Sequence, residues 1–203
     1  STIWSRNEEF KSEDFIDESQ RLLDNVPPHL QTCFLTASSK QILSYLWNNN
    51  PECFKNWKSE LDILKTLNEI ISNRIISFLE KDGCYEAKSV LLTTINEIGL
   101  LCVKLLLENK NFLTRDSYVK LRKVCNAKAS KAVDFRTVFS FLFYTEQSFS
   151  PDCGKYYYFF PYGMLDFYAS KYLVEKMIQK GVTLKEAVEE LTGCEMTPDN
   201  TWR

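Results

Sequence analysis

Apolar residues recur every three to four positions along most of the chain, the spacing that is typical of amphipathic α-helices. The clearest example is the stripe Leu61, Leu64, Leu67, Ile71, Ile75 and Phe78. Periodicity and helix-end signals predict helices over residues 12–26, 30–47, 60–81, 86–109, 115–124, 163–180 and 184–192. The first of these must end before Pro27-Pro28, because proline removes a backbone donor and disfavours helix at the residue before it. We therefore expect a mainly α-helical protein.

Several helix ends carry recognisable capping residues. Ser59 with Asp62 resembles a capping box, in which two side chains satisfy each other's backbone N–H groups, and Thr183 with Glu186 forms a second. Thr114 is placed to cap the helix that follows it. The last helix is expected to end at a glycine, residue 193, because glycine adopts the left-handed conformation of a C-terminal cap.

A second pattern appears between residues 135 and 168, which hold half of the chain's aromatic residues. The runs 140–147 and 155–160 favour strands, and the Pro-Asp and Gly of residues 149–154 favour a turn between them. Alternation along the second strand would place Tyr157 and Phe159 on one side and Tyr156, Tyr158 and Phe160 on the other. The predicted fold class is mainly α, a helical bundle plus a winged-helix-like subdomain with one short β-hairpin.

Composition narrows the class of protein further. The chain has 203 residues and a formal net charge of −2, so no global field attracts nucleic acid or acidic lipid. The most apolar run, residues 98–107, includes Lys104 and is shorter than the roughly 20 residues of a membrane span.

Seven cysteines occur without the close spacing of a zinc chelate, and Cys102 is expected to be a buried thiol. Free thiols suit the reducing cytosol, so we expect a cytoplasmic protein without a membrane segment.

Motifs that carry catalytic chemistry are missing from the sequence. It contains no phosphate-binding GxxxxGK[ST] or GxGxxG loop and no GxSxG elbow. The lone histidine, His29, stands beside two prolines and is expected to be a partly exposed residue at a helix start. The paired carboxylates Glu189-Glu190 and Asp14/Asp17 are expected on solvated helix faces. We therefore predict no catalytic residues, no metal ligands and no enzymatic activity.

Two clusters could bind a partner. The basic cluster comprises Lys120, Arg122, Lys123, Lys128 and Lys131. It could contact nucleic acid, but a solvated surface or a face that docks an acidic partner is the preferred interpretation. The aromatic run 156–160 could stack bases, yet only Lys155 accompanies it, so packing of a hairpin against helices is preferred.

Four stretches resemble NOD-like receptors and related NACHT-type STAND ATPases. Residues 89–101 (SVLLTTINEIGLL) resemble the first helix of their winged-helix domain, and residues 112–118 (FLTRDSY) resemble the segment after it. Residues 156–169 (YYYFFPYGMLDFYA) resemble the family stretch F-x-H-x-S-x-Q-E-F-x-A-A, where a strand leads into the next helical domain. Residues 35–47 resemble L-x-x-N-P-L-x-L-x-x-L-W of the first helical domain.

The resemblance implies a domain order and a function. Residues 1–83 would be a first helical domain, 84–162 the winged-helix domain, and 163–203 the start of a second helical domain. A nucleotide-binding domain would precede the chain, so ADP or ATP would bind only with that domain present. The implied function is a regulatory module in innate immune-type signalling, which packs on the nucleotide-binding domain, controls a closed-to-open switch and allows self-oligomerisation.

The sequence departs from the family at the nucleotide contacts. Pro161 replaces the histidine that contacts phosphate, Ser39 replaces the proline near adenine, and Leu165-Asp166 replace the Gln-Glu pair. We therefore expect the chain to bind no nucleotide by itself.

The hairpin is expected to be anchored to the helix after it by Phe159, Phe160, Met164 and Phe167. The alternatives are a stand-alone helical adaptor for a protein partner and, as a weaker hypothesis, a winged-helix nucleic-acid binder.

Overall fold

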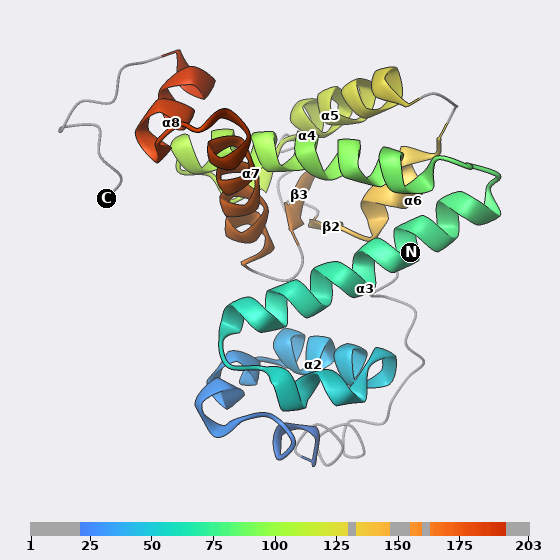
Figure 1. The fold of residues 1–203 in the computed structure, drawn as a ribbon. Helices are drawn as coiled ribbons and strands as arrows, with labels where there is room; N and C mark the ends of the chain where they lie inside the picture. The colour runs from blue at the N-terminus through green and yellow to red at the C-terminus, as the bar shows by residue number, and fades with distance from the viewer. Residues whose placement is uncertain (1–20, 130–132, 147–154, 160–162, 194–203) are drawn as a thin grey trace. The chain divides into compact units, whose positions relative to one another are not determined.

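The protein is mainly helical, with a small three-stranded antiparallel sheet (Figure 1). The structure is a computed structural model that describes residues 21–129, 133–146, 155–159 and 163–193. The chain divides into two compact units. Unit 1 comprises Ser1–Tyr85 and Arg136–Tyr144, and unit 2 comprises Glu86–Phe135 and Thr145–Arg203. Each unit is described separately below.

Within residues 21–85, four helical segments of unit 1 follow the helical residues 21–23. They are the 3-10 helix η2 (Pro28–Phe34), α2 (Ala37–Asn49), the 3-10 helix η3 (Pro51–Asn56) and α3 (Glu60–Lys81). The predicted helix over residues 30–47 is therefore wrong as a single element. Thr36 and Ser39 form a capping box that starts α2 afresh, and the exposed Leu35 separates it from η2.

Helix α3 begins with the predicted capping box of Ser59 and Asp62. Its buried row differs in part from the predicted stripe, because Leu61 is 49% exposed and Leu64 and Phe78 are half-buried. The buried residues follow a spacing of four: Ile63, Leu67, Ile71, Ile75 and Leu79. The two rows coincide in the middle of the helix and diverge at its ends.

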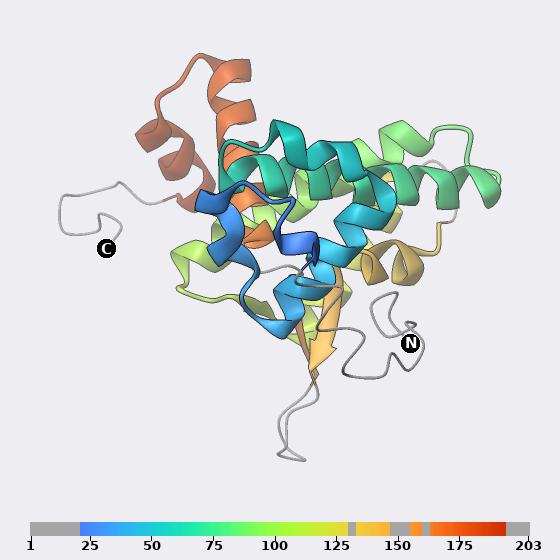
Figure 2. The same cartoon turned by 90° about the horizontal axis from the view of Figure 1, so that it is seen from below.

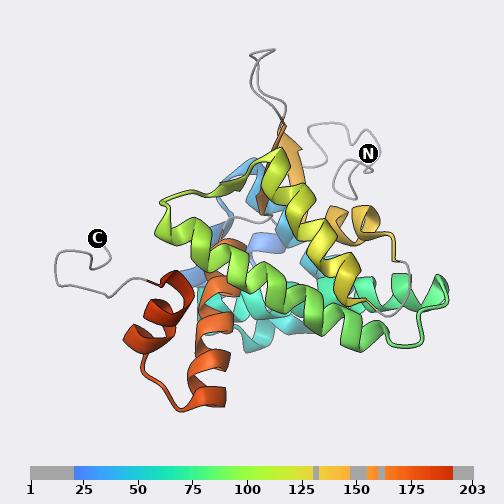
Figure 3. The same cartoon turned by 90° about the horizontal axis from the view of Figure 1, so that it is seen from above.

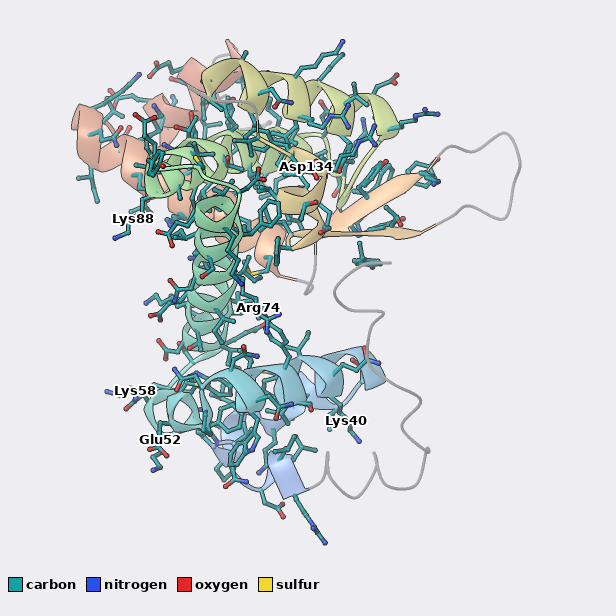
Figure 4. All side chains as sticks on the ribbon, turned by 90° about the vertical axis from the view of Figure 1, so that its right-hand side faces the viewer. Lys40, Glu52, Lys58, Arg74, Lys88 and Asp134 are labelled. Carbon is teal, nitrogen blue, oxygen red and sulfur yellow. The ribbon has the colours of Figure 1, made fainter. Side chains whose placement is uncertain are left out.

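An aromatic cluster fills the core of unit 1 beside α2. The rings of Phe54 and Trp57 lie 4.4 Å apart, and those of Phe34 and Trp57 lie 6.1 Å apart. Arg74 joins α3 to α2, because its guanidinium lies 4.6 Å from the centre of the Tyr45 ring and donates to Asn49 at 3.0 Å. Figure 4 shows Arg74 pointing from α3 toward α2.

Unit 2 is built around α4 (Ala87–Leu107), which is followed by β1 (Phe112–Leu113) and α5 (Arg115–Lys128). Unit 2 also contains β3 (Tyr156–Phe159), α7 (Met164–Lys180) and α8 (Leu184–Thr192). Most of α6 (Phe135–Ser140) and the start of β2 (Phe143–Glu146) lie in the segment Arg136–Tyr144 of unit 1. Figure 3 shows α5 beside α4, with α7 crossing α4. The predicted helix ends at Thr114, Thr183 and Gly193 are confirmed.

The sheet has the strand order β1-β3-β2 (Figure 2). Phe112 pairs with Tyr158 and Leu113 with Tyr157 in antiparallel register. The two predicted strands are confirmed in shorter form, but the sheet is more than one hairpin, because β1 adds a third strand. Two residues are too few for a readable alternation of side chains, so β1 escaped the sequence pattern. The predicted turn at 149–154 and the first helix up to residue 20 lie outside the described residues.

Two further helix predictions need correction. Helix α5 extends to Lys128, into the stretch where the sequence predicted that the helix had ended. Helix α6 occupies residues that were not predicted to be helical, and it ends at Ser140, where a strand was expected to begin. Phe135, Val138 and Phe139 of α6 are buried, so this short helix packs its apolar face into the core.

The predicted helix over residues 86–109 is confirmed as α4, which is slightly shorter at both ends, and its apolar stretch extends beyond the run 98–107. By length and composition alone, this helix of 21 residues could cross a membrane, and half of its apolar window is buried inside the structure. The expected burial of Cys102 is confirmed, and Leu91, Ile95, Ile98 and Leu105 of the same helix are also buried, whereas Leu101 is half-buried. That burial is also what the core helix of a folded domain would show.

Candidate functional site

The residues expected at lost nucleotide contacts have local roles or lie outside the described structure. The Ser39 hydroxyl donates to the carbonyl oxygen of Thr36 at 2.9 Å and accepts from its N–H at 3.0 Å. Ser39 is therefore engaged in the cap of α2. Leu165 is buried and Asp166 is exposed in the first turn of α7, and Pro161 lies outside the described residues.

His29 and Glu190 are surface groups, as expected, whereas Glu189 is half-buried. His29 is exposed at the start of η2, and its Nε2 lies 3.1 Å from the carbonyl oxygen of Lys58. Glu190 forms an ion pair with Lys180, and Glu189 lies 3.6 Å from Lys185. The other pair, Asp14/Asp17, lies outside the described residues.

The described cysteines are free thiols. Burial raises the pKa of Cys102 well above its ordinary value, raises that of Cys53 to about 11 and raises that of Cys125 to about 12. These three thiols therefore stay protonated near neutral pH, where only the thiolate is a nucleophile or a metal ligand. Within the described residues, no three His, Cys, Asp or Glu side chains are grouped to hold a metal ion.

Unit 1 has an open depression of about 320 Å³ between η3 and the first half of α3. Two of its polar groups serve the local fold. The Trp57 indole N–H donates to the hydroxyl of Thr66 at 3.1 Å, and the Asp62 carboxylate accepts the N–H groups of Lys58 and Ser59 as part of the α3 cap. The buried side-chain atoms that lack a partner in the described structure belong to Asn68 and Tyr168, neither of which lines the depression.

Helices α4 and α7 of unit 2 pack against each other at the α4–α7 junction, formed by Gly99 and Cys102 of α4 with Tyr168 and Tyr172 of α7. A Cβ added at Gly99 would lie 2.6 Å from the Cβ of Tyr172 and 3.1 Å from the backbone oxygen of Tyr168. Real Cβ atoms essentially never approach another heavy atom at 2.6 Å. Glycine therefore permits the two helices to pack this closely.

Tyr168 lies at the centre of this junction and is 1% exposed. Its hydroxyl is buried without a hydrogen-bond partner in the described structure. An unpaired buried hydroxyl costs free energy, and in most proteins such a group is hydrogen-bonded to another residue or to a buried water. Burial raises the pKa of Tyr168 far above its ordinary value, with a smaller contribution from Cys102. The phenol therefore stays neutral, and its ring supplies apolar contact area.

Ionic and polar contacts attach α5 to the same part of α4. Lys128 of α5 forms an ion pair with Glu97 of α4 at 2.5 Å, and this hydrogen bond raises the pKa of Lys128. Burial raises the pKa of Tyr172, and the negative charge of Glu97 raises it further. The Glu97 carboxylate thus raises the pKa of a side chain on α5 and of a side chain on α7.

Aromatic contacts attach the sheet to α5 and α7. The rings of Tyr118 and Tyr157 stack at 3.9 Å with an interplanar angle of 8°, and Phe159 lies 6.2 Å from Tyr168. Phe112 of β1 contacts both Tyr156 and Tyr158 of β3, at 4.8 and 5.9 Å. The predicted alternation along this strand is confirmed for the described residues.

The four predicted anchor residues divide into three groups. Phe159 and Met164 are buried, as expected, whereas Phe167 is half-buried. Phe160 lies outside the described residues. The sequence analysis did not single out Gly99, Tyr118 or Tyr168. An isolated glycine within an apolar helical pattern was the signal available for Gly99, because such a glycine often marks close packing.

The basic cluster is divided by the structure. Lys120, Arg122, Lys123 and Lys128 all lie on α5, and Lys131 lies outside the described residues. Lys128 forms an ion pair with Glu97, while Lys120 and Lys123 are exposed.

Comparison of the chain with protein-family models, with curated proteins and with solved structures finds no match.

Proposed function

We propose that this chain is a non-catalytic regulatory and interaction module, of the kind formed by the helical and winged-helix region of NOD-like receptors. In this proposal it packs on a nucleotide-binding domain and changes orientation when that domain switches from closed to open. The helix of residues 60–81 would end the first helical domain, the sheet and its helices would form the winged helix, and α7 would begin the second helical domain.

The observation that carries the proposal is the packing of two segments that are far apart in sequence. Residues 89–101 and 156–169 carry the family resemblance, and they supply the α4 and β3–α7 parts of unit 2. They meet where Gly99 of the first segment approaches the backbone oxygen of Tyr168 of the second. Segments of one module are expected to share a core in this way.

The order of elements gives further support. Helix, strand, helix, helix and two strands follow one another from α4 to β3, and the first strand pairs with the last. A winged helix has this order. Gly99 and the buried Tyr168 hold α4 and α7 closely together, which favours their movement as one body, a requirement for a switch between two discrete arrangements.

Two measurements test the proposal. The parent gene is expected to encode a Walker A loop upstream of this chain, and a complete gene without one would contradict the proposal. The isolated chain is also expected to keep its melting temperature when ADP is added, since a ligand stabilises only the state that binds it. A clear rise in melting temperature would show that nucleotide contacts remain on this chain.

A further inference from the structure

Helix α5 has an excess of positive charge. It contains Arg115, Lys120, Arg122, Lys123 and Lys128, with Asp116 as its only carboxylate. Lys128 is paired with Glu97, and the ion pairs within the described residues include none of the other four cations. We call Arg115, Lys120, Arg122 and Lys123 the basic face of α5.

Three of these cations, Arg115, Lys120 and Lys123, are exposed, and Arg122 is half-buried. Leu121 and Cys125 are the buried residues of α5. The exposed Lys123 lies on the side opposite to them, Lys120 lies on one flank, and Arg115 and Arg122 lie on the other flank. Arg115 and Arg122 are seven positions apart, so they share one side of the helix about 10 Å apart along its axis. Nitrogen-tipped side chains project outward from α5 in Figure 4.

Local helix stability does not account for this arrangement. Arg115 occupies the first position of α5, at the positive end of the helix dipole, where a cation is unfavourable. Lys120 and Lys123 are three positions apart on the exposed surface, and like charges at this spacing repel each other. In α8, by contrast, Lys185 lies near a carboxylate one turn away. A ligand that supplies negative charge would offset both unfavourable terms in α5.

We propose that the basic face of α5 is a docking surface for an acidic polypeptide segment, rich in Asp and Glu. Arginine suits this ligand because its planar guanidinium can bind a carboxylate through two parallel hydrogen bonds. This surface is separate from the α4–α7 junction and does not depend on the function proposed above.

Three observations favour a polypeptide over nucleic acid. The basic face spans eight helix steps, or about 12 Å, and β1 and β3 beside it contain no cation. Tyr118 is stacked on Tyr157 and is not available as a platform for a base. Helix α6, which would occupy the place of a recognition helix, has six residues, of which Phe135, Val138 and Phe139 are buried.

The test measures binding of a fluorescein-labelled glutamate-rich peptide to the 203-residue chain by fluorescence anisotropy, at low and high salt. We expect binding at low salt that weakens as salt screens the charges. The double variant Arg115→Gln/Arg122→Gln should bind about tenfold more weakly, since two charge-assisted contacts are lost. Its unfolding midpoint should not fall, because removing Arg115 relieves the helix dipole.

The matched control removes the same charge elsewhere in unit 2. Lys88 and Lys104 are exposed on α4 and have no ion pair within the described residues, so Lys88→Gln/Lys104→Gln should keep the wild-type affinity. Equal losses in the two variants, or no peptide binding at low salt, would overturn the proposal. A short DNA duplex serves as a competitor. DNA binding that is tighter than peptide binding and is lost only in the α5 variant would assign the surface to nucleic acid instead.

Discussion

Gly99 controls how closely two helices approach, although it contributes no side chain. Alanine has a helix propensity about 1 kcal/mol better than glycine, so Gly99→Ala would stabilise an exposed helix. Here the added Cβ would lie 2.6 Å from the Cβ of Tyr172, and overpacking of this kind typically costs about 1–3 kcal/mol. We expect a net loss of stability of up to about 2 kcal/mol in denaturant unfolding.

Ser89→Ala is the matched control for that variant, because Ser89 is exposed on the same helix. It should leave the free energy of unfolding unchanged or raise it slightly. A Gly99→Ala protein as stable as this control would mean that α4 and α7 do not pack as closely as described.

Phe159 provides a second test at the scale of single residues. It is 5% exposed and contacts Tyr168, so Phe159→Ala should lower the free energy of unfolding by about 3–5 kcal/mol. Phe167 also contacts Tyr168, at 5.6 Å, but is only half-buried. Phe167→Ala should therefore lower the free energy of unfolding by clearly less than Phe159→Ala. Equal losses in the two variants would show that the two positions do not differ in burial.

At the scale of elements, the sequence predicts best where local chemistry determines the structure. The caps at Ser59, Thr114 and Thr183 were readable because a hydroxyl residue and its partner stand three positions apart. Thr36 was missed because the predicted helix of residues 30–47 ran through it, so no helix start was expected there. Strand β1 was missed for a different reason, since two residues become a strand only by pairing with Tyr157 and Tyr158.

The cap of α8 makes the stability of that helix depend on pH. Hydrogen bonds from the backbone N–H and then the hydroxyl of Thr183 lower the pKa of Glu186 below its ordinary value of 4.5. A carboxylate with a lowered folded pKa contributes stability that is present above about pH 4.5 and is lost as pH falls through the folded value. We expect α8 to lose helicity in this acidic range before the rest of unit 2.

Amide exchange measured by NMR across this pH range would test the prediction for α8. In the variant Glu186→Gln the protonation step at this position is removed, so exchange in α8 should show a smaller change with pH. An unchanged profile in that variant would assign the effect to other carboxylates.

At the scale of the whole molecule, α4 is the element on which unit 2 depends. Ile98 is fully buried, so Ile98→Asp would bury a charge without a partner and should cost more than about 4 kcal/mol, enough to unfold the unit. Leu92, on the same helix, is 58% exposed, and Leu92→Lys should change stability by less than about 0.5 kcal/mol. Circular dichroism with urea unfolding of both variants would measure the difference.

The sequence could predict the helical class and the aromatic strands, because both follow from local periodicity. It could not predict that Gly99 meets Tyr172, since that contact joins residues more than seventy positions apart. The basic residues were visible as a cluster, but the pairing of Lys128 with Glu97, and so the four cations left unpaired in the described structure, required the fold. Local sequence patterns therefore predict which residues could bind a partner, and tertiary contacts determine which of those residues are left without an ion pair in the described structure.

The path of the chain between the units has a practical consequence for anyone who clones this protein in pieces. Unit 1 includes Arg136–Tyr144, a segment encoded far from the rest of it, and Phe141 from this segment contacts Phe78 of α3 at 6.3 Å. A truncated clone that stops at residue 85 would leave Phe78 without this neighbour. We expect such a fragment to be poorly soluble, and the same fragment carrying residues 136–144 on a flexible linker to express better.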